Sequence, residues 1–284
     1  MSTLIIGATG NIGTQVVQQL VTDNQHVIAA GRDVKKVKSH FGLSGISFRP
    51  FDFTNQNTWQ DALEAVANMF LVVPPGSASE EEQVAFFKVA KEMGVQHVVF
   101  SSGRSTGPIV GSPLNQTEGF VKNSDMGWTI LRPGWFMQNF IEWIGFTIST
   151  DNAFYLPAGD SKTAFIDVRD IGAVAAEILT HPLRHSGKMY DLTAAEAIDH
   201  FAVAEHLSAV AGRTIRYVPM EEHDFIIKMV EKGRPKKAAE KMASLYSIVR
   251  EGHEAVVSDD VQNILQRKPI DFEKFARDYA HVWH

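Results

Sequence analysis

The chain has 284 residues, 44% of them hydrophobic, and a formal net charge of -6. This size and composition are typical of a globular protein with one large or two unequal domains, and the acidic balance gives direct nucleic-acid binding little support. Cysteine is absent, which excludes disulfides and thiolate chemistry, and no histidine spacing indicates a metal site. Because a strand-like segment starts directly after Met1-Ser2-Thr3 and no long apolar run follows, we expect a cytoplasmic protein without a membrane span.

The first predicted elements are an apolar strand at residues 4–6, a glycine-rich turn and an amphipathic helix. The turn reads Gly-x-x-Gly-x-x-Gly, one residue longer than the general dinucleotide fingerprint. Glycines let backbone N–H groups approach a pyrophosphate, and the helix N-terminus adds partial positive charge. The pattern predicts a dinucleotide site, with an ordinary strand-to-helix turn as the alternative. Its expected residues are Gly7, Thr9, Gly10, Asn11, Ile12 and Gly13.

A second strand, predicted at residues 26–30, ends in Gly31-Arg32-Asp33. NAD-binding proteins usually place an acidic residue at this strand tip to accept from the ribose 2′-hydroxyl. Here the position holds Arg32, and Lys36 follows on the helix that Asp33 is expected to cap. Two cations suit a 2′-phosphate, so the sequence predicts NADP(H) rather than NAD(H). The alternative is that both cations are simply solvated.

Further strands are predicted at 46–51, 69–73, 98–100 and 128–131, alternating with helices. The alternation predicts an α/β fold with a doubly wound parallel sheet. We expect the carboxyl ends of these strands to complete the cofactor site, and Pro74-Pro75-Gly76 to stop a strand where the nicotinamide ribose passes. Asp52 is an adenine ligand in this interpretation and a turn cap in the alternative. The expected residues are Asp52, Phe53, Val73, Pro74, Ser101, Ser102 and Pro133.

Aromatic residues follow the sixth predicted strand directly, and Met and aromatic residues recur in the helical C-terminal part. Such side chains suit a pocket for flat ligands, although they equally suit hinge packing or ordinary core. Asn139 and Gln138 could orient a carbonyl oxygen or could bond backbone. Asp170 is predicted to cap a helix, and His253 to be structural. The expected substrate-pocket residues are Trp135, Phe136, Asn139, Met229 and Tyr246.

Five sequence motifs resemble those of the NmrA-like branch of the atypical short-chain dehydrogenase/reductases. They are GATGNIG at 7–13, VFSS at 99–102, WTILRPGWFMQN at 128–139, FIDVRDI at 165–171 and GHEAVVSDD at 252–260. The resemblance implies a Rossmann sheet of order 3-2-1-4-5-6, NADP(H) at its switch point and a smaller C-terminal domain. We therefore expect a Rossmann domain at 1–185 and a smaller, mainly helical substrate or partner domain at 186–284. A homodimer or a regulatory protein partner is compatible with it.

Standard short-chain reductases protonate the substrate with a tyrosine that precedes a lysine by four residues, and no tyrosine of this chain does so. The serine that usually accompanies the pair aligns with Ser102 or, shifted by one, with Gly103. Losing a general acid usually costs about 10²–10⁴ in rate, which disfavours difficult carbonyl substrates. Hydride transfer to a quinone-like or other conjugated acceptor remains the leading hypothesis, because such acceptors spread the incoming charge over a ring. The alternatives are a non-catalytic redox-sensing regulator and, less favoured, an isomerase or epimerase.

Overall fold

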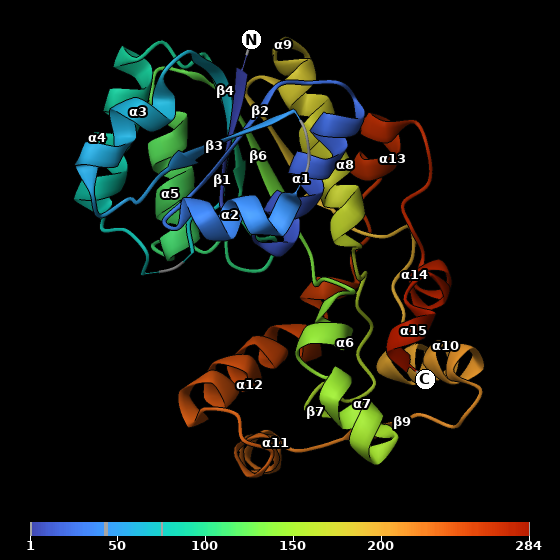
Figure 1. The fold of residues 1–284 in the computed structure, drawn as a ribbon. Coiled ribbons are helices and arrows are strands. Elements are labelled where there is room, and N and C mark those ends of the chain that lie inside the picture. The colour runs from blue at the N-terminus through green and yellow to red at the C-terminus, as the bar shows by residue number, and fades with distance from the viewer. Residues whose placement is uncertain (1, 43–44, 75, 284) are drawn as a thin grey trace. The chain divides into compact units, whose positions relative to one another are not determined.

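The computed structural model describes residues 2–42, 45–74 and 76–283, and a seven-stranded parallel sheet organises one of its two compact units (Figure 1). The strands lie in the order β3-β2-β1-β4-β5-β6-β8, each parallel to its neighbour. The predicted order 3-2-1-4-5-6 is confirmed, and a seventh strand extends the sheet beyond β6. The bounds of the seven strands are β1 Ser2–Ile6, β2 Val27–Gly31, β3 Ile46–Pro50, β4 Val66–Leu71, β5 His97–Ser101, β6 Gly127–Pro133 and β8 Lys188–Leu192.

Helices cover both faces of this sheet, as the predicted α/β fold requires. In Figure 1, α3, α4 and α5 lie on one side of the strands and α1 and α8 on the other. Trp59, Phe86 and Val121 from the first group pack against the strands in one continuous core. The helices of the unit that contains this sheet are α1 Asn11–Thr22, α2 Val34–Phe41, η1 Gln56–Thr58, α3 Trp59–Leu63, α4 Glu80–Glu92, α5 Pro113–Lys122, α8 Val168–Thr180, α9 Pro182–His185 and α13 Asp260–Leu265.

Local sequence signals fix several helix ends. The Asp33 side chain caps α2 as predicted, and Ser79 with Glu82 forms a capping box at the start of α4. Gly94, at φ +87°, follows α4 in the left-handed conformation expected of a helix C′ residue. Val66 begins β4, because α3 ends at Leu63 and the chain turns there.

The remaining elements form a mainly helical unit with a small parallel sheet, β7 Ala153–Leu156 beside β9 Arg216–Pro219. Its core is rich in aromatic side chains, including the fully buried Phe140, Phe154 and Phe275. The helices of this unit are α6 Asn139–Glu142, α7 Gly145–Asp151, α10 His200–Ala211, α11 Glu222–Glu231, α12 Lys236–Arg250, η2 His253–Ala255, α14 Phe272–Asp278 and α15 Ala280–Trp283.

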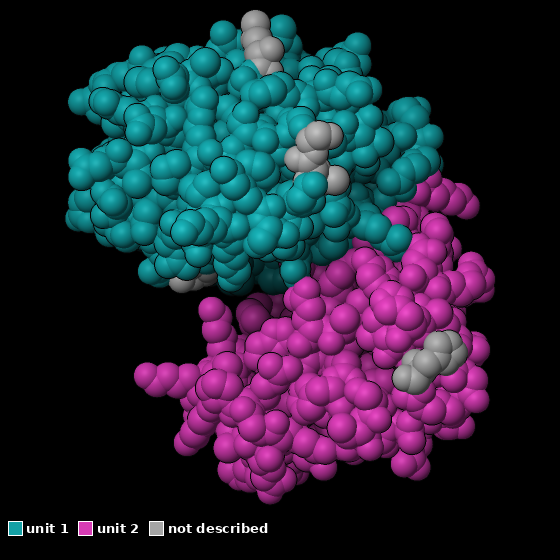
Figure 2. All heavy atoms as spheres, viewed as in Figure 1, with its two compact units in different colours: residues 1–133, 168–192, 260–267 teal, residues 134–167, 193–259, 268–284 magenta. Residues whose placement is uncertain are grey.

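The two compact units exchange chain segments. Unit 1 consists of residues 1–133, 168–192 and 260–267, and unit 2 of residues 134–167, 193–259 and 268–284 (Figure 2). This division differs from the predicted single boundary between 185 and 186, because β8 belongs to the large sheet and residues 134–167 belong to the helical unit. Among the described residues, no helix is both long and apolar enough to span a bilayer.

Candidate functional site

Close backbone contacts fix the shape of the glycine turn between β1 and α1. Gly7 has φ +83°, and the Gly10 amide donates to the Gly7 carbonyl at 3.0 Å. A Cβ on Gly13 would overlap that same carbonyl group and lie 2.9 Å from the Ala8 Cα. Gly10 precedes α1 as its N-cap, and Thr9 and Gly10 are exposed while Asn11 and Ile12 begin the helix. The turn therefore presents an exposed helix N-terminus without side chains in the way, which fits a pyrophosphate.

Two unpaired cations lie at the tip of the neighbouring strand. Arg32 follows β2, Lys36 lies in the first turn of α2, and both side chains are exposed. Within the described residues, neither side chain forms an ion pair or donates a hydrogen bond to protein. The Asp33 carboxylate accepts from the backbone amides of Lys35 and Lys36 at 2.9 and 3.1 Å, which fixes the start of α2. The positions fit the predicted 2′-phosphate contact.

The ends of β3 and β4 offer fewer free side chains. The Asp52 carboxylate accepts from the amide and hydroxyl of Thr54, at 3.0 and 2.9 Å, and so closes its own turn. Phe53 is buried against Phe51 and Phe86. Val73 is buried and Pro74 is exposed, whereas Pro75 of the predicted strand stop lies outside the described residues. Adenine binding at Asp52 and Phe53 stays a prediction. An adenine there would have to contact atoms that the Asp52 turn does not already engage.

A buried carboxylate organises the ends of β5 and β6. Glu118 of α5 is 1% exposed and accepts from Arg132 twice, Nε at 2.9 Å and Nη2 at 2.6 Å. The Ser102 hydroxyl also donates to Glu118, at 2.7 Å. This bidentate contact raises the pKa of the Arg132 guanidinium further, so the guanidinium stays charged. Ser101 and Pro133 are buried strand ends beside the network, and the predicted Ser102 hydroxyl is thus committed to protein.

Unit 2 gathers four of the five predicted substrate-pocket residues around one narrow cavity. Trp135, Asn139, Met229 and Tyr246 line it, whereas Phe136 pairs with Ile166 in an isolated bridge and is not among its lining. We call this cavity the aromatic slot. The remaining lining residues are Trp143, Ile144, Tyr155, Leu156, Phe225 and Met242.

The aromatic slot is nearly closed and nearly apolar. Its free volume is about 10 Å³, and the rings of Trp135 and Tyr246 lie 4.7 Å apart. Burial strongly raises the pKa of the Tyr246 hydroxyl, which therefore stays protonated. Neither this hydroxyl nor the Asn139 side-chain amide hydrogen-bonds to another described residue. The slot thus holds two available polar groups between aromatic walls.

Two lining residues of the aromatic slot, Trp143 and Tyr155, were not among those predicted from the sequence. Trp143 follows Asn139 by one helical turn and could have been found from that spacing. Tyr155 lies on β7, a strand that the sequence did not indicate, and carried no local signal. Gln138, the second candidate for orienting a carbonyl, donates to Asp167 at 3.0 Å and is buried. It is therefore a structural residue of this loop, bonded through its side chain to Asp167.

A buried histidine lies behind the slot. His200 begins α10, is 1% exposed and packs against the rings of Phe165, Tyr217 and Tyr246. Neither ring nitrogen has a hydrogen-bond partner in the described part of the chain, and burial lowers the pKa of His200 to about 4. The imidazole is consequently neutral at physiological pH. No sequence pattern singled out this residue.

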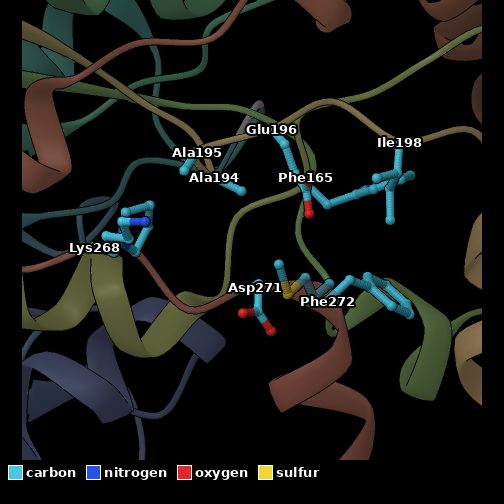
Figure 3. A pocket seen from close by; sticks show the side chains of 10 residues that line it. Phe165, Ala194, Ala195, Glu196, Ile198, Lys268, Asp271 and Phe272 are labelled. Carbon is cyan, nitrogen blue, oxygen red and sulfur yellow. The ribbon is translucent and has the colours of Figure 1, made fainter.

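Two further features are the position of Asp170 in unit 1 and a second cavity in unit 2. Asp170 lies inside α8, not at its cap as predicted, because the helix begins at Val168; it is buried and pairs with Arg267 at 2.7 Å. Unit 2 also contains a separate cavity of about 340 Å³, which is lined by apolar side chains, Phe165 and Phe272 among them, and by charged ones (Figure 3). Those charged residues are Glu196, Lys268 and Asp271. Among the described residues, no group of three acidic or histidine side chains could hold a metal ion.

A family model described as "NmrA-like family" matches residues 2–276. The chain belongs to this family. Among curated proteins, an NAD(P)H azoreductase of Xenophilus azovorans is 33% identical over 98% of this chain and 97% of its own length. Among solved structures, the NADPH complex of an Escherichia coli NADPH-dependent quinone oxidoreductase superposes with a TM-score of 0.87 over all of both chains, at 22% identity. The NADP(H) complex of a Citrobacter triphenylmethane reductase gives 0.84 over 99% of this chain and all of that one, at 24% identity. These structures confirm the Rossmann fold.

Proposed function

We propose that this chain is an NADP(H)-dependent reductase that transfers a hydride to a quinone-like or other conjugated small molecule. The observation that carries the proposal is the aromatic slot, in which Trp135 and Tyr246 offer ring faces and Asn139 offers an unbonded amide. The azoreductase that is 33% identical over nearly the whole chain supports a reductase of conjugated acceptors.

The carboxyl edge of the sheet fits the cofactor. The Gly7–Gly13 turn leaves backbone N–H groups open to a pyrophosphate, and a side chain at Gly13 would destroy that geometry. Arg32 and Lys36 supply the charge that a 2′-phosphate needs. NADPH bound there would supply the hydride. Two relatives in this fold have been crystallised with the same nucleotide, which supports the assignment.

The aromatic slot suits a flat acceptor whose entry displaces flexible side chains. With about 10 Å³ free, the slot holds no more than about one water molecule until Met229 and Met242 change rotamers. A ring that replaces these side chains would stack on Trp135, and its polar atom would meet Asn139 or the Tyr246 hydroxyl. These contacts position the acceptor without requiring a strong acid.

Proton supply by the protein is disfavoured on the α5 side. The Glu118 carboxyl oxygens accept from Arg132 and from the Ser102 hydroxyl, so both side chains are engaged with protein and neither is offered as a free proton donor. The reduced acceptor would take its proton from solvent, which is sufficient for acceptors that delocalise charge. This interpretation predicts turnover of quinones, azo compounds and triphenylmethane dyes and little turnover of simple ketones.

The test is NADPH oxidation by the full chain against a quinone, an azo dye, a triphenylmethane dye and an unconjugated ketone. We expect turnover with at least one conjugated acceptor, and a rise in its KM for Trp135→Ala with unchanged NADPH binding. Absence of turnover with all three would overturn the reductase assignment. If NADPH and NADP⁺ then bound equally well, the regulator hypothesis would replace it.

A further inference from the structure

One cation at the carboxyl edge of the large sheet has a buried nitrogen without an acceptor. Arg104 comes shortly after Ser101, the last residue of β5, and its backbone amide donates to the carbonyl of Pro133, the last residue of β6, at 3.0 Å. Its guanidinium Nη1 is buried, and within the described ranges this nitrogen donates to no acceptor and the side chain forms no ion pair. Because a buried donor without an acceptor destabilises a fold, we looked for a ligand that supplies the acceptor.

The loop that carries Arg104 is anchored on both sides. The Gly107 amide donates to the Gly103 carbonyl at 2.8 Å, and the Asn115 side chain of α5 donates to the Gly107 carbonyl at 2.9 Å. A Cβ on Gly107 would lie 2.5 Å from Glu118 Oε1, so this turn packs directly on the buried carboxyl group. The backbone at Arg104 is thus tied to β6 and α5, and its guanidinium needs little rearrangement to meet a ligand.

Glu118 does not serve as the acceptor for Arg104, although it lies against this turn. It accepts from Arg132 Nε and Nη2 at 2.9 and 2.6 Å, and the Ser102 hydroxyl donates to it at 2.7 Å. Lys122 Nζ is a further cation, 3.7 Å from Glu118 Oε2. An arginine guanidinium is charged at any physiological pH, so Arg104 presents a positive charge that no described acidic side chain pairs with.

A second buried donor lies in the loop after the neighbouring strand. Ser77 follows β4, which pairs with β5, and its hydroxyl is buried with no hydrogen-bond partner in the described part of the chain. The loops at the carboxyl ends of parallel strands share one edge of the sheet, which is where open α/β sheets bind their ligands. Two adjacent strands of this edge therefore each lead to a buried donor that protein does not satisfy.

The strand order places Arg104 in the redox half of the expected nucleotide site. In a doubly wound sheet, strands β1–β3 form one mononucleotide-binding half and β4–β6 the other. The proposed 2′-phosphate contacts, Arg32 and Lys36, belong to the first half. Arg104 follows β5, which lies two strands from β1, or roughly 10 Å at ordinary strand spacing. This half is where the nicotinamide would meet the ring that accepts its hydride.

We propose that Arg104 stabilises the negative charge that hydride transfer places on the acceptor, an inference that rests on the reductase function proposed above. A neutral quinone that gains a hydride from NADPH becomes an anion, and the charge resides on a ring oxygen. Arg104 Nη1 donates a hydrogen bond to that oxygen and keeps its own proton. A proton from solvent then neutralises the anion, which gives the hydroquinone and NADP⁺.

The charge of the acceptor decides whether a fixed guanidinium helps. A quinone or an azo compound is neutral and becomes an anion when it gains a hydride, whereas a triphenylmethane dye is a cation and becomes neutral. A positive charge held beside the acceptor favours the first change and opposes the second. Removal of Arg104 should therefore separate the two classes of acceptor, which a general loss of folding would not do.

The test is NADPH oxidation by the full chain with a neutral quinone and with a cationic triphenylmethane dye. In Arg104→Met we expect kcat for the quinone to fall by about tenfold to a hundredfold and kcat for the dye to stay unchanged or rise. Arg184→Met, which removes an exposed arginine of α9 in the same unit, is the matched control and should change neither.

Equal losses with both acceptors, or no loss with the quinone, would overturn the role of Arg104 and leave the reductase assignment intact. No turnover by the wild-type chain with either of these acceptors or with an azo dye would overturn both. If the wild type reduces only one class of acceptor, a binding measurement decides.

The binding measurement uses para-nitrophenol and needs no turnover. The protein is saturated with NADP⁺, and absorption distinguishes the bound phenolate from the bound phenol. Phenolate affinity should fall about tenfold in Arg104→Met, and less in Arg104→Lys, which keeps the charge. Absence of a phenolate preference in the wild type overturns the proposal. A loss of NADP⁺ affinity with unchanged phenolate preference would assign Arg104 to the cofactor and overturn it as well.

Discussion

The glycine edge of unit 1 and the aromatic slot of unit 2 are built on opposite principles. The edge is exposed and defined by backbone geometry, since Gly7 and Gly13 leave no room for side chains. The slot is buried and defined by side chains, and the two methionines at its wall, Met229 and Met242, are the adaptable ones. The comparison teaches that a site set by backbone geometry suits one fixed polar group, as we propose for the cofactor, whereas a site walled by flexible side chains suits several flat acceptors, as we propose for the slot.

The largest effect should come from breaking the rigid site. Gly13→Ala drives a methyl group into the Gly7 carbonyl, so we expect a loss of more than about 4 kcal/mol in unfolding free energy together with NADPH binding. The matched control is Gly119→Ala in α5, where a Cβ would meet nothing within 4 Å. That substitution should stabilise the chain by about 0.5–1 kcal/mol. Equal urea midpoints for the two variants would show that the turn is not sterically fixed.

Removing the buried carboxylate beside this edge should have the next largest effect. Glu118→Leu leaves the Arg132 guanidinium without its partner, at a cost of about 3 kcal/mol in unfolding free energy. Glu273→Leu, which breaks the exposed pair with Arg277, should cost less than about 1 kcal/mol. Urea denaturation of both variants measures the difference, and similar costs would mean that Glu118 is effectively solvated.

Unit 2 should lose stability in acid because of His200. The unfolded chain protonates this residue near the ordinary histidine pKa of 6.5, but the folded chain resists until about 4. The unfolded state thus binds more protons between these values, and stability is complete above pH 6.5 and falls as pH drops toward 4, by about 3 kcal/mol. His97 of unit 1, whose pKa is also lowered to about 4, adds to the loss of stability over the same pH range.

His200→Phe should therefore make the unfolding free energy less dependent on pH between 6.5 and 4. His223→Phe is the control, since that residue is exposed. Denaturation curves at several pH values compare the three proteins. An unchanged slope in His200→Phe would mean that the buried ring is protonated in the folded state.

These three effects also show where sequence reasoning succeeded. The strand, glycine turn and helix at the start of the chain and the exposed position of Arg32 could be located from local patterns, and the strand order from the family resemblance, whereas the cofactor contacts of these residues stay predictions. The strand β7 and the ion pair of Asp170 could not, because β7 pairs with a strand about sixty residues later and Arg267 lies far along the chain. His200 escaped notice for the same reason: its surroundings come from several distant segments.

A smaller effect is expected on the preference for NADPH over NADH. Arg32→Ala removes one charge-assisted contact, so NADPH affinity should fall about tenfold or more while NADH affinity stays unchanged. Lys38→Ala is the control, because this cation lies in the adjacent helix α2 but over the Phe48 ring. Calorimetric titration of both nucleotides measures the change. Parallel losses for NADPH and NADH would refute the role of Arg32 at the 2′-phosphate.

The smallest effect concerns the slot itself. The Tyr246 hydroxyl has no partner among the described residues, so Tyr246→Phe should leave the unfolding free energy unchanged or slightly higher. Acceptor binding should weaken by about fivefold, seen as a higher KM, if this hydroxyl contacts the acceptor. Tyr217→Phe provides the contrast, because its hydroxyl donates to the Leu156 and Gly159 carbonyls and its loss should cost stability.

The exchange of segments between the units has a consequence for biosynthesis. Residues 1–133 emerge from the ribosome with six strands of the large sheet, but its edge strand β8 and the covering helix α8 follow only after the first part of unit 2 has been made. The last piece of unit 1, residues 260–267, contains α13, and unit 2 continues after it. Neither unit can therefore finish folding before residue 267 has been translated, and a stop before that point would leave both incomplete.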